Sequence, residues 1–440
     1  MERREYLLKA YHDNQNEIDA RIKEGIEKYR KGNATIRLTD KTGKPINGTV
    51  RVQLKNHAFR FGANCFMLDE MESAEKNEHY QNKFAEVFNL ATLPFYWKDL
   101  EPQPGKLRFA RNSEKIYRRP APDLCLDYCR AHGIEPKAHC LNYMQWSPDW
   151  LPDDIKETKR LLEKRFAELA ERYADQIPNW EVINETLCSC ARKFFYDPEI
   201  VEWSFATARR YFPHNELTIN EATETARFIW TNHYVGNRIP YYTQIERALA
   251  KGASIDSIGL QYHLFFRREE EKNRTKMLLD PTFLYKIHDL YADFGLPMQI
   301  TEVTLPAYSK EETDEALQAE MLTMLYRTWF SMERMEKVIY WNLQDGYAAF
   351  APQGDMAAGE NYFHGALLRF DGSEKPAYRC LRKLVREEWH TDECGTAGTD
   401  GFAFRGFFGD YEAEISVNGC SHTLPFTIKK GENNQFTLAL

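Results

Sequence analysis

Between residues 57 and 388, short apolar runs alternate with longer segments whose apolar residues recur at helical spacing. Such alternation is typical of βα units, in which parallel strands are joined by helices. Parallel strands are buried on both faces, so each is expected as a nearly continuous apolar run of strand length. Eight runs fit this description: Phe59–Ala63, Leu90–Leu93, Glu135–Leu141, Asn179–Asn184, Glu216–Asn220, Ser257–His263, Pro297–Val303 and Lys337–Leu343.

The number of runs favours a closed sheet. Eight strands with eight helices form an α/β barrel of the (β/α)8 or TIM type, which needs roughly 250 residues, and the chain has 440. An open doubly wound sheet is the alternative, but it would carry a Gly-rich phosphate loop after its first strand, and none is present. Segments of helical length between the runs include Lys156–Tyr173, Glu202–Tyr211, Tyr241–Lys251 and Glu311–Trp329.

The two ends of the chain follow different patterns from the barrel region, 57–388. Residues 1–33 are highly charged with apolar positions at helical spacing, which predicts an amphipathic helix packed outside the barrel. Residues 34–56 alternate like two strands around a turn, and residues 389–440 return to such alternation. Because each β segment is too small for its own core, we expect the two to pack together as a small two-layer β unit.

The composition of the chain limits the kinds of molecule that it can bind. With 58 Lys and Arg against 66 Asp and Glu, the net charge of −8 leaves no basic field for nucleic acid or an anionic membrane. No apolar stretch reaches the 18 residues of a membrane span, and the first residues lack the apolar segment of a signal peptide. Aromatic residues make up 14% of the chain, which suits stacking on sugars, although most should be core. The oligomeric state stays open.

The nine cysteines are scattered and odd in number, which favours free thiols in a reducing compartment. We therefore expect a cytoplasmic protein, with secretion open if the chain is a processed form. Cys188 and Cys190 are the one tight pair, but two ligands without a nearby His or further Cys make a weak metal site. We expect neither a metal nor an organic cofactor.

Two of the predicted strands carry a glutamate at the carboxyl end, Glu185 after the fourth and Glu302 in the seventh. In barrels that end carries the chemistry, and strands four and seven face one another. Two carboxyls about 5 Å apart can cleave a glycosidic bond with retention. For either run alone, a surface glutamate paired with a lysine is the simpler explanation, so the surrounding residues must decide.

The sixth predicted strand supplies such a neighbour. It ends in Gln261 and His263, beside the strand of Glu302. An imidazole there could hydrogen-bond the Glu302 carboxylate and hold it ionised and oriented. A purely structural histidine is the alternative.

Motifs along most of the chain occur in the order of a known family. Trp180–Glu185, Ile258–His263 and Ile300–Glu302 resemble the active-site strands of glycoside hydrolase family 10, the retaining endo-β-1,4-xylanases. The resemblance implies hydrolysis of xylan or xylo-oligosaccharides through a covalent glycosyl-enzyme intermediate. Further similar segments are His57–Gly62, Glu101–Gly105, Pro148–Leu151, Phe205–Arg209, Trp341 with Asp345, Lys375–Tyr378 and Phe404–Glu412.

The resemblance also implies roles for single residues. Glu185 would be the acid/base, Glu302 the nucleophile, and Asn184 a donor to the sugar 2-hydroxyl. Trp341 would stack beneath the reacting sugar, although core packing is the alternative for a strand aromatic. The other candidates for supporting or contacting the substrate are Gln261, His263, His139, Tyr96, Trp97 and Tyr143.

The chain departs from the family pattern on the glycone side. Where the family usually has Glu-Asn-x-x-Lys after strand two, this chain has Thr92–Trp97, and the family's Trp-His after strand three is Tyr143-Met144. The second strand-eight Trp falls near Ala349 or Phe350. We therefore expect polar contacts to the glycone to be lost, and the substrate to shift towards a decorated or apolar glycone. Another β-linked glycan, or a sugar-binding protein without turnover, remains an alternative, and endo or exo action stays open.

Overall fold

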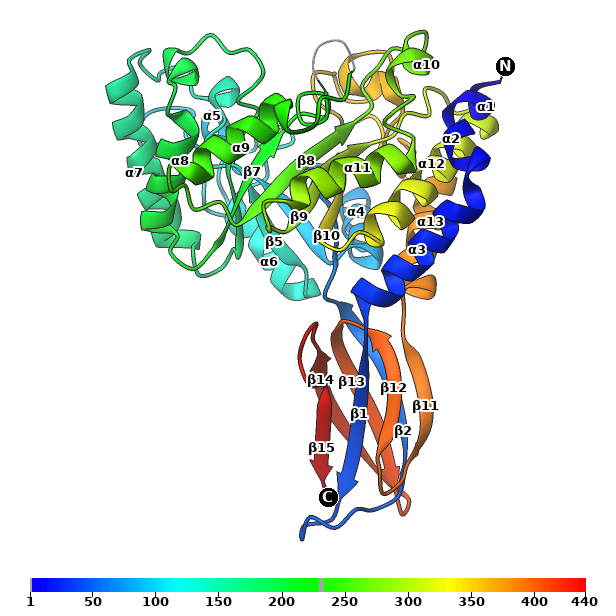
Figure 1. Ribbon diagram of the computed structural model, residues 1–440. Helices are drawn as coiled ribbons and strands as arrows, with labels where there is room; N and C mark the ends of the chain where they lie inside the picture. Colours follow the sequence, from blue (N-terminus) through cyan, green and yellow to red (C-terminus); the bar gives the residue numbers. More distant parts are fainter. Residues whose placement is uncertain (1, 229–232) are drawn as a thin grey trace.

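The computed structural model describes residues 2–228 and 233–440, in which a closed parallel barrel stands on a slender β-sandwich (Figure 1). Strand order around the barrel follows the chain, and the last strand pairs with the first. The predicted fold class is confirmed. The barrel strands are β3 (Arg60–Asn64), β4 (Leu90–Pro94), β5 (Glu135–His139), β6 (Asn179–Asn184), β7 (Glu216–Glu221), β8 (Ser257–His263), β9 (Met298–Thr304) and β10 (Met335–Tyr340).

The predicted strands agree with the observed ones to within three residues, with the largest difference at β10. This strand ends at Tyr340, so Trp341 lies just beyond it. The Trp341 N–H still donates to Val303 O at 2.7 Å, but Asn342 has a φ of 72°, which turns the chain out of the sheet. The polar residues that follow therefore belong to the loop at the barrel mouth.

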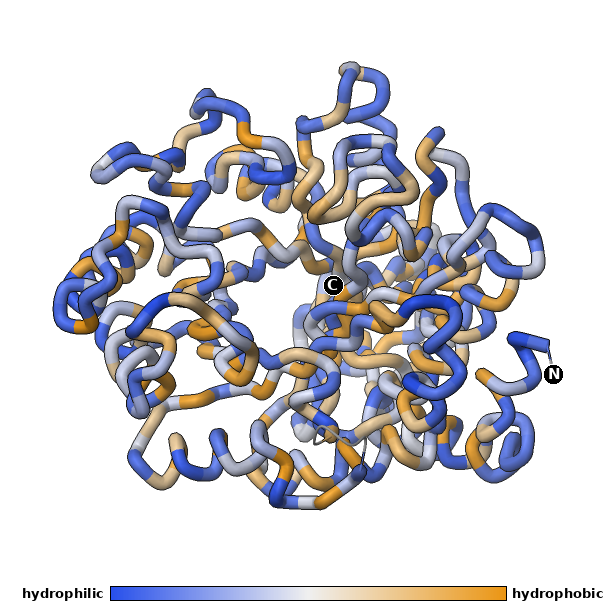
Figure 2. Tube along the Cα trace, turned by 90° about the horizontal axis from the view of Figure 1, so that it is seen from above, coloured by the Kyte–Doolittle hydropathy of each residue, from blue (hydrophilic) through white to orange (hydrophobic). Residues whose placement is uncertain are grey.

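Helices cover the outside of the barrel. Asp154 caps α7 by accepting from Glu157 N, and α9, α11 and α13 each begin with proline, whose fixed φ suits the first helical position. Seen from the end opposite the sandwich, helices and loops ring the barrel axis (Figure 2). The helices that follow the barrel strands are α4 (Ala74–Val87), α6 (Pro122–His132), α7 (Ile155–Tyr173), α8 (Ile200–Tyr211), α9 (Pro240–Ala250), α11 (Pro281–Ala292), α12 (Glu312–Phe330) and α13 (Pro376–Lys383), with short helices α5 (Trp97–Leu100) and α10 (Glu271–Arg274) in the loops.

The N-terminal segment forms three helices, α1 (Arg3–Leu7), α2 (Lys9–Asp13) and α3 (Gln15–Arg30), rather than the single helix expected. At the second break the Asn14 side chain donates to Ala10 O at 3.1 Å, and such local bonds compete with helix continuation. Helix α3 lies close against the end of α12, where a Cβ on Gly25 would meet Ser331 O at 2.3 Å.

The sandwich combines strands from both ends of the chain (Figure 1). One sheet has the order β12-β1-β15 and the other β11-β2-β13-β14. Along β13, buried Tyr411, Ala413, Ile415 and Val417 alternate with exposed residues, which is the pattern of a sheet with one face in a core. The strands are β1 (Lys31–Thr39), β2 (Gly48–His57), β11 (Asp392–Ala397), β12 (Phe402–Phe407), β13 (Gly409–Val417), β14 (Cys420–Ile428) and β15 (Gln435–Ala439).

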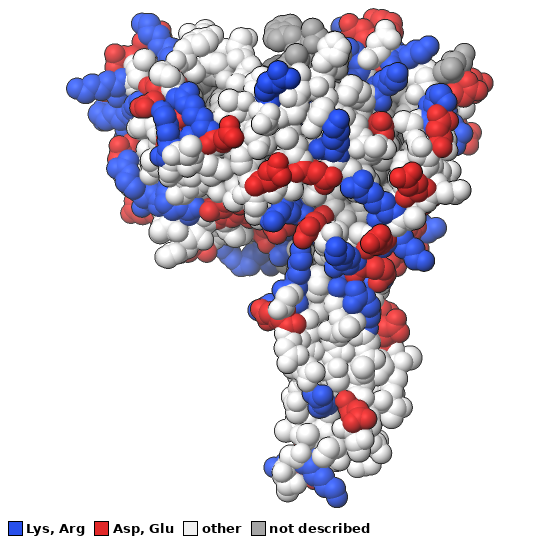
Figure 3. All heavy atoms as spheres, in the orientation of Figure 1, with Lys and Arg blue, Asp and Glu red and all other residues white. Residues whose placement is uncertain are grey.

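The surface shows no field of a single sign on the face drawn in Figure 3, where Lys and Arg are interspersed with Asp and Glu over the barrel. The sandwich carries few charged side chains on this face. Within the described ranges, none of the helices combines the length and the apolar character that crossing a bilayer would need.

Candidate active site

A cavity of about 510 Å³ lies at the carboxyl ends of the barrel strands, the end that carries the chemistry in barrel enzymes. A cavity of similar size, about 540 Å³, lies at the opposite end, where the barrel meets the sandwich. Nine of the ten residues singled out from the sequence line the first cavity: Tyr96, His139, Tyr143, Asn184, Glu185, Gln261, His263, Glu302 and Trp341.

Glu302 lies on β9 and is only 4% exposed. Its Oε1 accepts from Asn220 Nδ2 at 2.9 Å, and its Oε2 lies 3.0 Å from His263 Nε2. Burial raises the pKa of Glu302, and His139 opposes that rise. Burial also lowers the pKa of His263 to about 4, so this imidazole is neutral at pH 7. Neutral His263 can therefore donate to an ionised Glu302 or accept from a protonated one.

Glu185 directly follows β6, and its φ of 53° is a left-handed conformation that non-glycine residues seldom adopt. Such a backbone persists only where the surroundings hold it, and it is concentrated at functional sites. Both carboxylate oxygens are held, since Tyr143 Oη donates to Oε2 at 2.6 Å and Gln261 Nε2 donates to Oε1 at 2.8 Å. The carboxyl of Glu185 is thus fixed in direction.

A chain of amides joins the two glutamates. Asn184 Oδ1 accepts from Asn220 Nδ2 at 3.0 Å and from Gln261 Nε2 at 3.3 Å, and these same nitrogens contact Glu302 and Glu185. Because the Asn184 oxygen faces these donors, its amide nitrogen is left to donate to a ligand. Asn220 is not among the site residues predicted from the sequence. It is nevertheless the last residue of the fifth predicted run, and residues at strand ends carry the chemistry in barrels.

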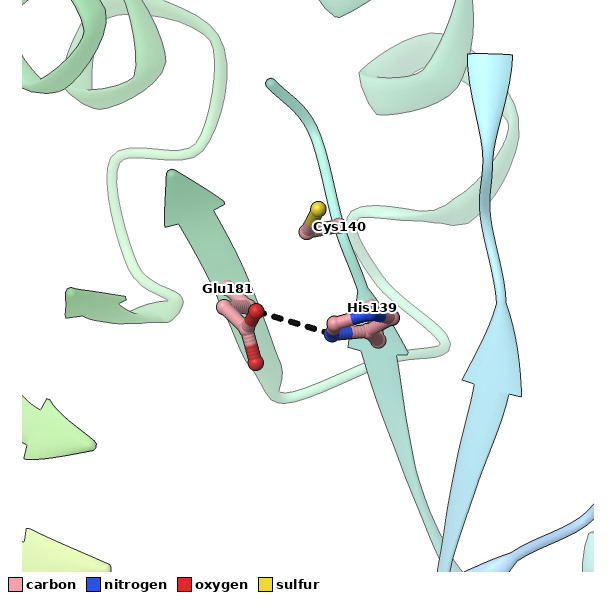
Figure 4. A group of neighbouring side chains, drawn as sticks. All are labelled: His139, Cys140 and Glu181. Carbon is pink, nitrogen blue, oxygen red and sulfur yellow. Dashed lines mark ion pairs between the residues drawn. The ribbon is translucent and has the colours of Figure 1, made fainter. Parts of the chain in front are cut away.

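A buried ion cluster adjoins the cavity, and Figure 4 shows two of its members, His139 and Glu181. His139 Nδ1 lies 2.8 Å from Glu181 Oε1, and Lys137 Nζ lies 2.8 Å from Glu181 Oε2. Burial opposes ionisation, but the two cations lower the pKa of Glu181, and Glu181 in turn raises the pKa of His139. His139 is therefore engaged below the cavity as well as lining it.

The same cluster with Cys140 has ligand-type atoms within 4.8 Å of one another, so its fit to a metal ion can be tested. Both oxygens of Glu181 already face cations, and burial holds the pKa of the Cys140 thiol well above its ordinary value. To bind a metal here, Cys140 would have to be a thiolate and Glu181 would need carboxylate oxygens without other partners. The donor set fits a buried ion pair better than a metal centre.

Trp341 satisfies both alternatives considered from the sequence. It lines the cavity, yet it is only 5% exposed. Its ring meets Phe66 edge-on at 5.1 Å and His263 at 5.8 Å between centroids. The indole is thus a rigid surface beside the nucleophile candidate, held by its packing partners.

The prediction that Trp97 contacts the ligand is wrong. Trp97 begins helix α5, its Nε1 donates to Glu101 Oε2 at 2.8 Å, and its ring packs against Trp150 at 5.8 Å. It is not part of the cavity lining. Trp97 is buried against these partners, whereas Tyr96, the residue before the helix, lines the cavity.

The expected loss of polar contacts on the glycone side stays a prediction, and the structure adds two charged residues to the cavity wall. Leu93, Phe95 and Met144 are buried and do not line the cavity. Arg118 and Arg119, later in the same connection after β4, do line it. They lie in an irregular loop without period or motif, so nothing in the sequence pointed to them. The cavity lining also includes Trp146, Phe350 and Glu360.

Comparison with curated proteins gives distant relatives that match over nearly the whole chain. The anti-sigma-I factor RsgI6 of Acetivibrio thermocellus is 25% identical over 90% of this chain and 46% of that protein. Endo-1,4-beta-xylanase 2 of Arabidopsis thaliana is 20% identical over 92% of this chain and 34% of its own length. The chain therefore spans less than half the length of these relatives.

Among solved structures, native xylanase 10B from Thermotoga maritima has a TM-score of 0.59 and 18% identity, covering 75% of this chain and 96% of that one. Xylanase 10B from Thermotoga petrophila, in complex with xylobiose, has a TM-score of 0.58 and 17% identity over 75% and 95%. At such identities the likeness establishes the fold alone. The family model described as "Glycosyl hydrolase family 10" matches residues 54–383. Since that match spans well over half of this chain, the chain belongs to glycosyl hydrolase family 10.

Proposed function

We propose that this chain is a retaining glycoside hydrolase that cleaves β-1,4-linked xylan or xylo-oligosaccharides. The observation that carries the proposal is the pair Glu185 and Glu302 in one cavity, joined through the amides of Asn184, Asn220 and Gln261. Membership of family 10 supports the proposal, as do several relatives whose names are endo-1,4-beta-xylanases.

The chemistry follows a double displacement. Glu302 attacks the anomeric carbon while Glu185 gives its proton to the leaving oxygen, so that a glycosyl ester forms on Glu302. Glu185 then takes a proton from water, which attacks the same carbon and releases the sugar with its original configuration. At its start this cycle needs Glu302 ionised and a proton on Glu185. Burial raises the pKa of Glu302 and so opposes its ionisation, which its hydrogen-bond partners must offset.

The surrounding residues direct that proton. Asn220 and His263 both donate to Glu302 when it is ionised, and charge-assisted hydrogen bonds of this kind favour the ionised form. Tyr143 and Gln261 hold the Glu185 carboxyl towards the cavity. The Asn184 amide nitrogen is positioned to donate to a sugar hydroxyl next to the anomeric carbon.

Two alternatives keep the same cavity. The first is the same mechanism on another β-linked glycan. The second is a sugar-binding protein without turnover, which one observation favours: a relative that matches 90% of this chain is named an anti-sigma-I factor rather than a hydrolase. Against it stands the intact pair of glutamates with all four of their hydrogen-bond partners.

The test compares Glu185→Gln, Glu302→Ala and a surface control, Glu171→Gln, which changes an exposed residue of α7. General acid catalysis contributes roughly 10²–10⁴ in rate, so Glu185→Gln should lose that much on xylohexaose and far less on an activated aryl β-xylobioside. Glu302→Ala should be inactive on both, and the control should match the wild type. Inverted product configuration by NMR would contradict the mechanism.

The alternatives give different outcomes in the same experiments. Faster hydrolysis of cello-oligosaccharides than of xylo-oligosaccharides by the wild type would favour another β-glycan. Binding of xylohexaose by calorimetry without any hydrolysis, even of the aryl glycoside, would favour the non-catalytic alternative.

A further inference from the structure

Arg118 is a buried cation in the cavity wall without an ion pair. It is only 4% exposed, its Nη1 donates to Asn342 Oδ1 at 3.0 Å and to Tyr347 O, and its Nε makes no hydrogen bond. Among the described residues no carboxylate forms an ion pair with it. Its φ of 63° is a left-handed conformation that non-glycine residues seldom adopt and that is concentrated at functional sites.

The neighbouring charges do not neutralise Arg118 directly. Arg119 beside it is balanced, because its Nε donates to Asp99 Oδ2 at 2.7 Å. Glu360 also lines the cavity, but its Oε2 accepts from Asn342 Nδ2 at 3.3 Å and lies 3.4 Å from Ala349 N. A buried charge without a contacting counter-ion is costly, and the guanidinium fork matches a carboxylate in shape and charge.

The rings around this guanidinium suit a sugar. Trp146 and Phe350 line the cavity with their ring centroids 6.0 Å apart, and Phe66, which is buried and does not line it, lies behind the wall at 5.7 Å from Arg118 Cζ. Phe66 also packs against Trp341, the ring next to the nucleophile candidate, and Trp341 lines the same cavity as Arg118. The loops after β4, β5 and β10 form this part of the cavity. By resemblance to the family, these loops contact the glycone.

We propose that Arg118 binds the carboxylate of an acidic sugar, and that the preferred ligand is a xylo-oligosaccharide whose glycone carries a uronic acid branch. This inference rests on the proposed function and specifies its substrate. A neutral xylan chain would leave the cation of Arg118 facing hydroxyl groups only. The carboxylate of a uronic acid would give it the missing ion pair, with the sugar rings against Trp146 and Phe350.

The decisive comparison changes only the charge of the ligand. Calorimetry with the wild type measures binding of a xylo-oligosaccharide with one glucuronic acid branch on its non-reducing xylose, and of its methyl ester. A hydrogen-bonded charged group contributes more than a neutral one, so the acid should bind about 10- to 100-fold more tightly. Equal binding of acid and ester would overturn the proposal, whatever the variants do.

Three variants assign the preference to one residue. Arg118→Gln should bring the acid-to-ester ratio close to one, and Arg118→Lys should keep part of it. Lys115→Gln removes an exposed charge of the same loop outside the cavity, and should keep the full ratio. A ratio that survives in a folded Arg118→Gln would refute the assignment. If that variant does not fold, the wild-type comparison decides.

Failure of the proposed function would be recognised separately. Hydrolysis of unbranched xylohexaose tests the activity and does not involve the uronic acid. A wild type that prefers the acid in calorimetry but hydrolyses nothing would keep the carboxylate site and reject the hydrolase. A wild type that hydrolyses xylohexaose and binds acid and ester equally would do the reverse.

Discussion

Replacing Glu302 by Gln should stabilise the folded protein, and the gain should grow as the pH rises from 5 to 8. Burial raises the pKa of Glu302 above its ordinary value of 4.5. Above that pH the unfolded chain releases the proton while the folded protein retains it. The wild type therefore loses free energy of unfolding as the pH rises towards the folded pKa, because the folded state binds more protons. The amide variant has no proton to lose.

The structure bounds the size of this effect. One proton bound by the folded state alone is worth about 1.4 kcal/mol per pH unit, so three units give at most about 4 kcal/mol. His139 and Lys137 favour the charged form of Glu302, so we expect about 1–3 kcal/mol. Gln fits the site, since its Oε1 can accept from Asn220 while its Nε2 donates to His263 Nε2.

Urea unfolding followed by tryptophan fluorescence at pH 5, 6.5 and 8 would measure the difference between variant and wild type. Asp392→Asn is the matched control. Hydrogen bonds from Arg51 and Gln53 lower the pKa of Asp392 to about 2, so its contribution is complete above pH 5 and its difference should be flat. A flat or falling difference for Glu302→Gln would refute the argument that burial of this carboxyl costs stability.

Three further outcomes are expected. Glu181→Gln should leave two buried cations unpaired and lower the free energy of unfolding in urea by about 3–5 kcal/mol. Adding Lys137→Met to this variant should recover part of the lost stability. If the losses of the two single variants simply add in the double variant, the ion cluster is contradicted. Tyr143→Phe removes the 2.6 Å hydrogen bond to Glu185 and should lower kcat on xylohexaose about 10-fold with unchanged circular dichroism; a change in KM alone would exclude a role in positioning. Deleting residues 390–440 removes the strands that cover β2 and should make the protein aggregate; a soluble barrel with unchanged Tm would show that the sandwich is dispensable.

The barrel could be predicted because its strands are buried on both faces. A run such as Ser257–His263 contains few charged residues and can be recognised without its partners. The points where a helix breaks or a strand ends are harder to predict, because they depend on local interactions of single residues. The break at Asn14 depends on a side-chain hydrogen bond to Ala10 O, and the end of β10 depends on the left-handed turn at Asn342. Neither interaction changes the spacing of apolar residues, so neither can be predicted from that spacing.

Some residues of the candidate site could be predicted from the sequence and others could not, for the same reason. Glu185, His263 and Glu302 lie at strand ends, where a rule of the fold gives their position. Arg118 reaches the cavity only because Asn342 and Tyr347, more than 220 residues later, accept its hydrogen bonds. Loop residues of this kind are placed by tertiary contacts, so a single sequence gives no reason to select them over other arginines.

The sandwich also imposes an order on the synthesis of the protein. Strands β1 and β2 leave the ribosome early, whereas the partners of β2 come far later, as the 341-residue separation of Arg51 and Asp392 shows. At about 5–20 residues per second, β2 waits roughly 20–70 s with its apolar face and its edges unpaired. The barrel can close during that time, but these strands cannot. A translation that stops before β11 therefore leaves β1 and β2 without their strand partners beside a closed barrel, and such exposed apolar strands are the kind of surface that chaperones and proteases act on.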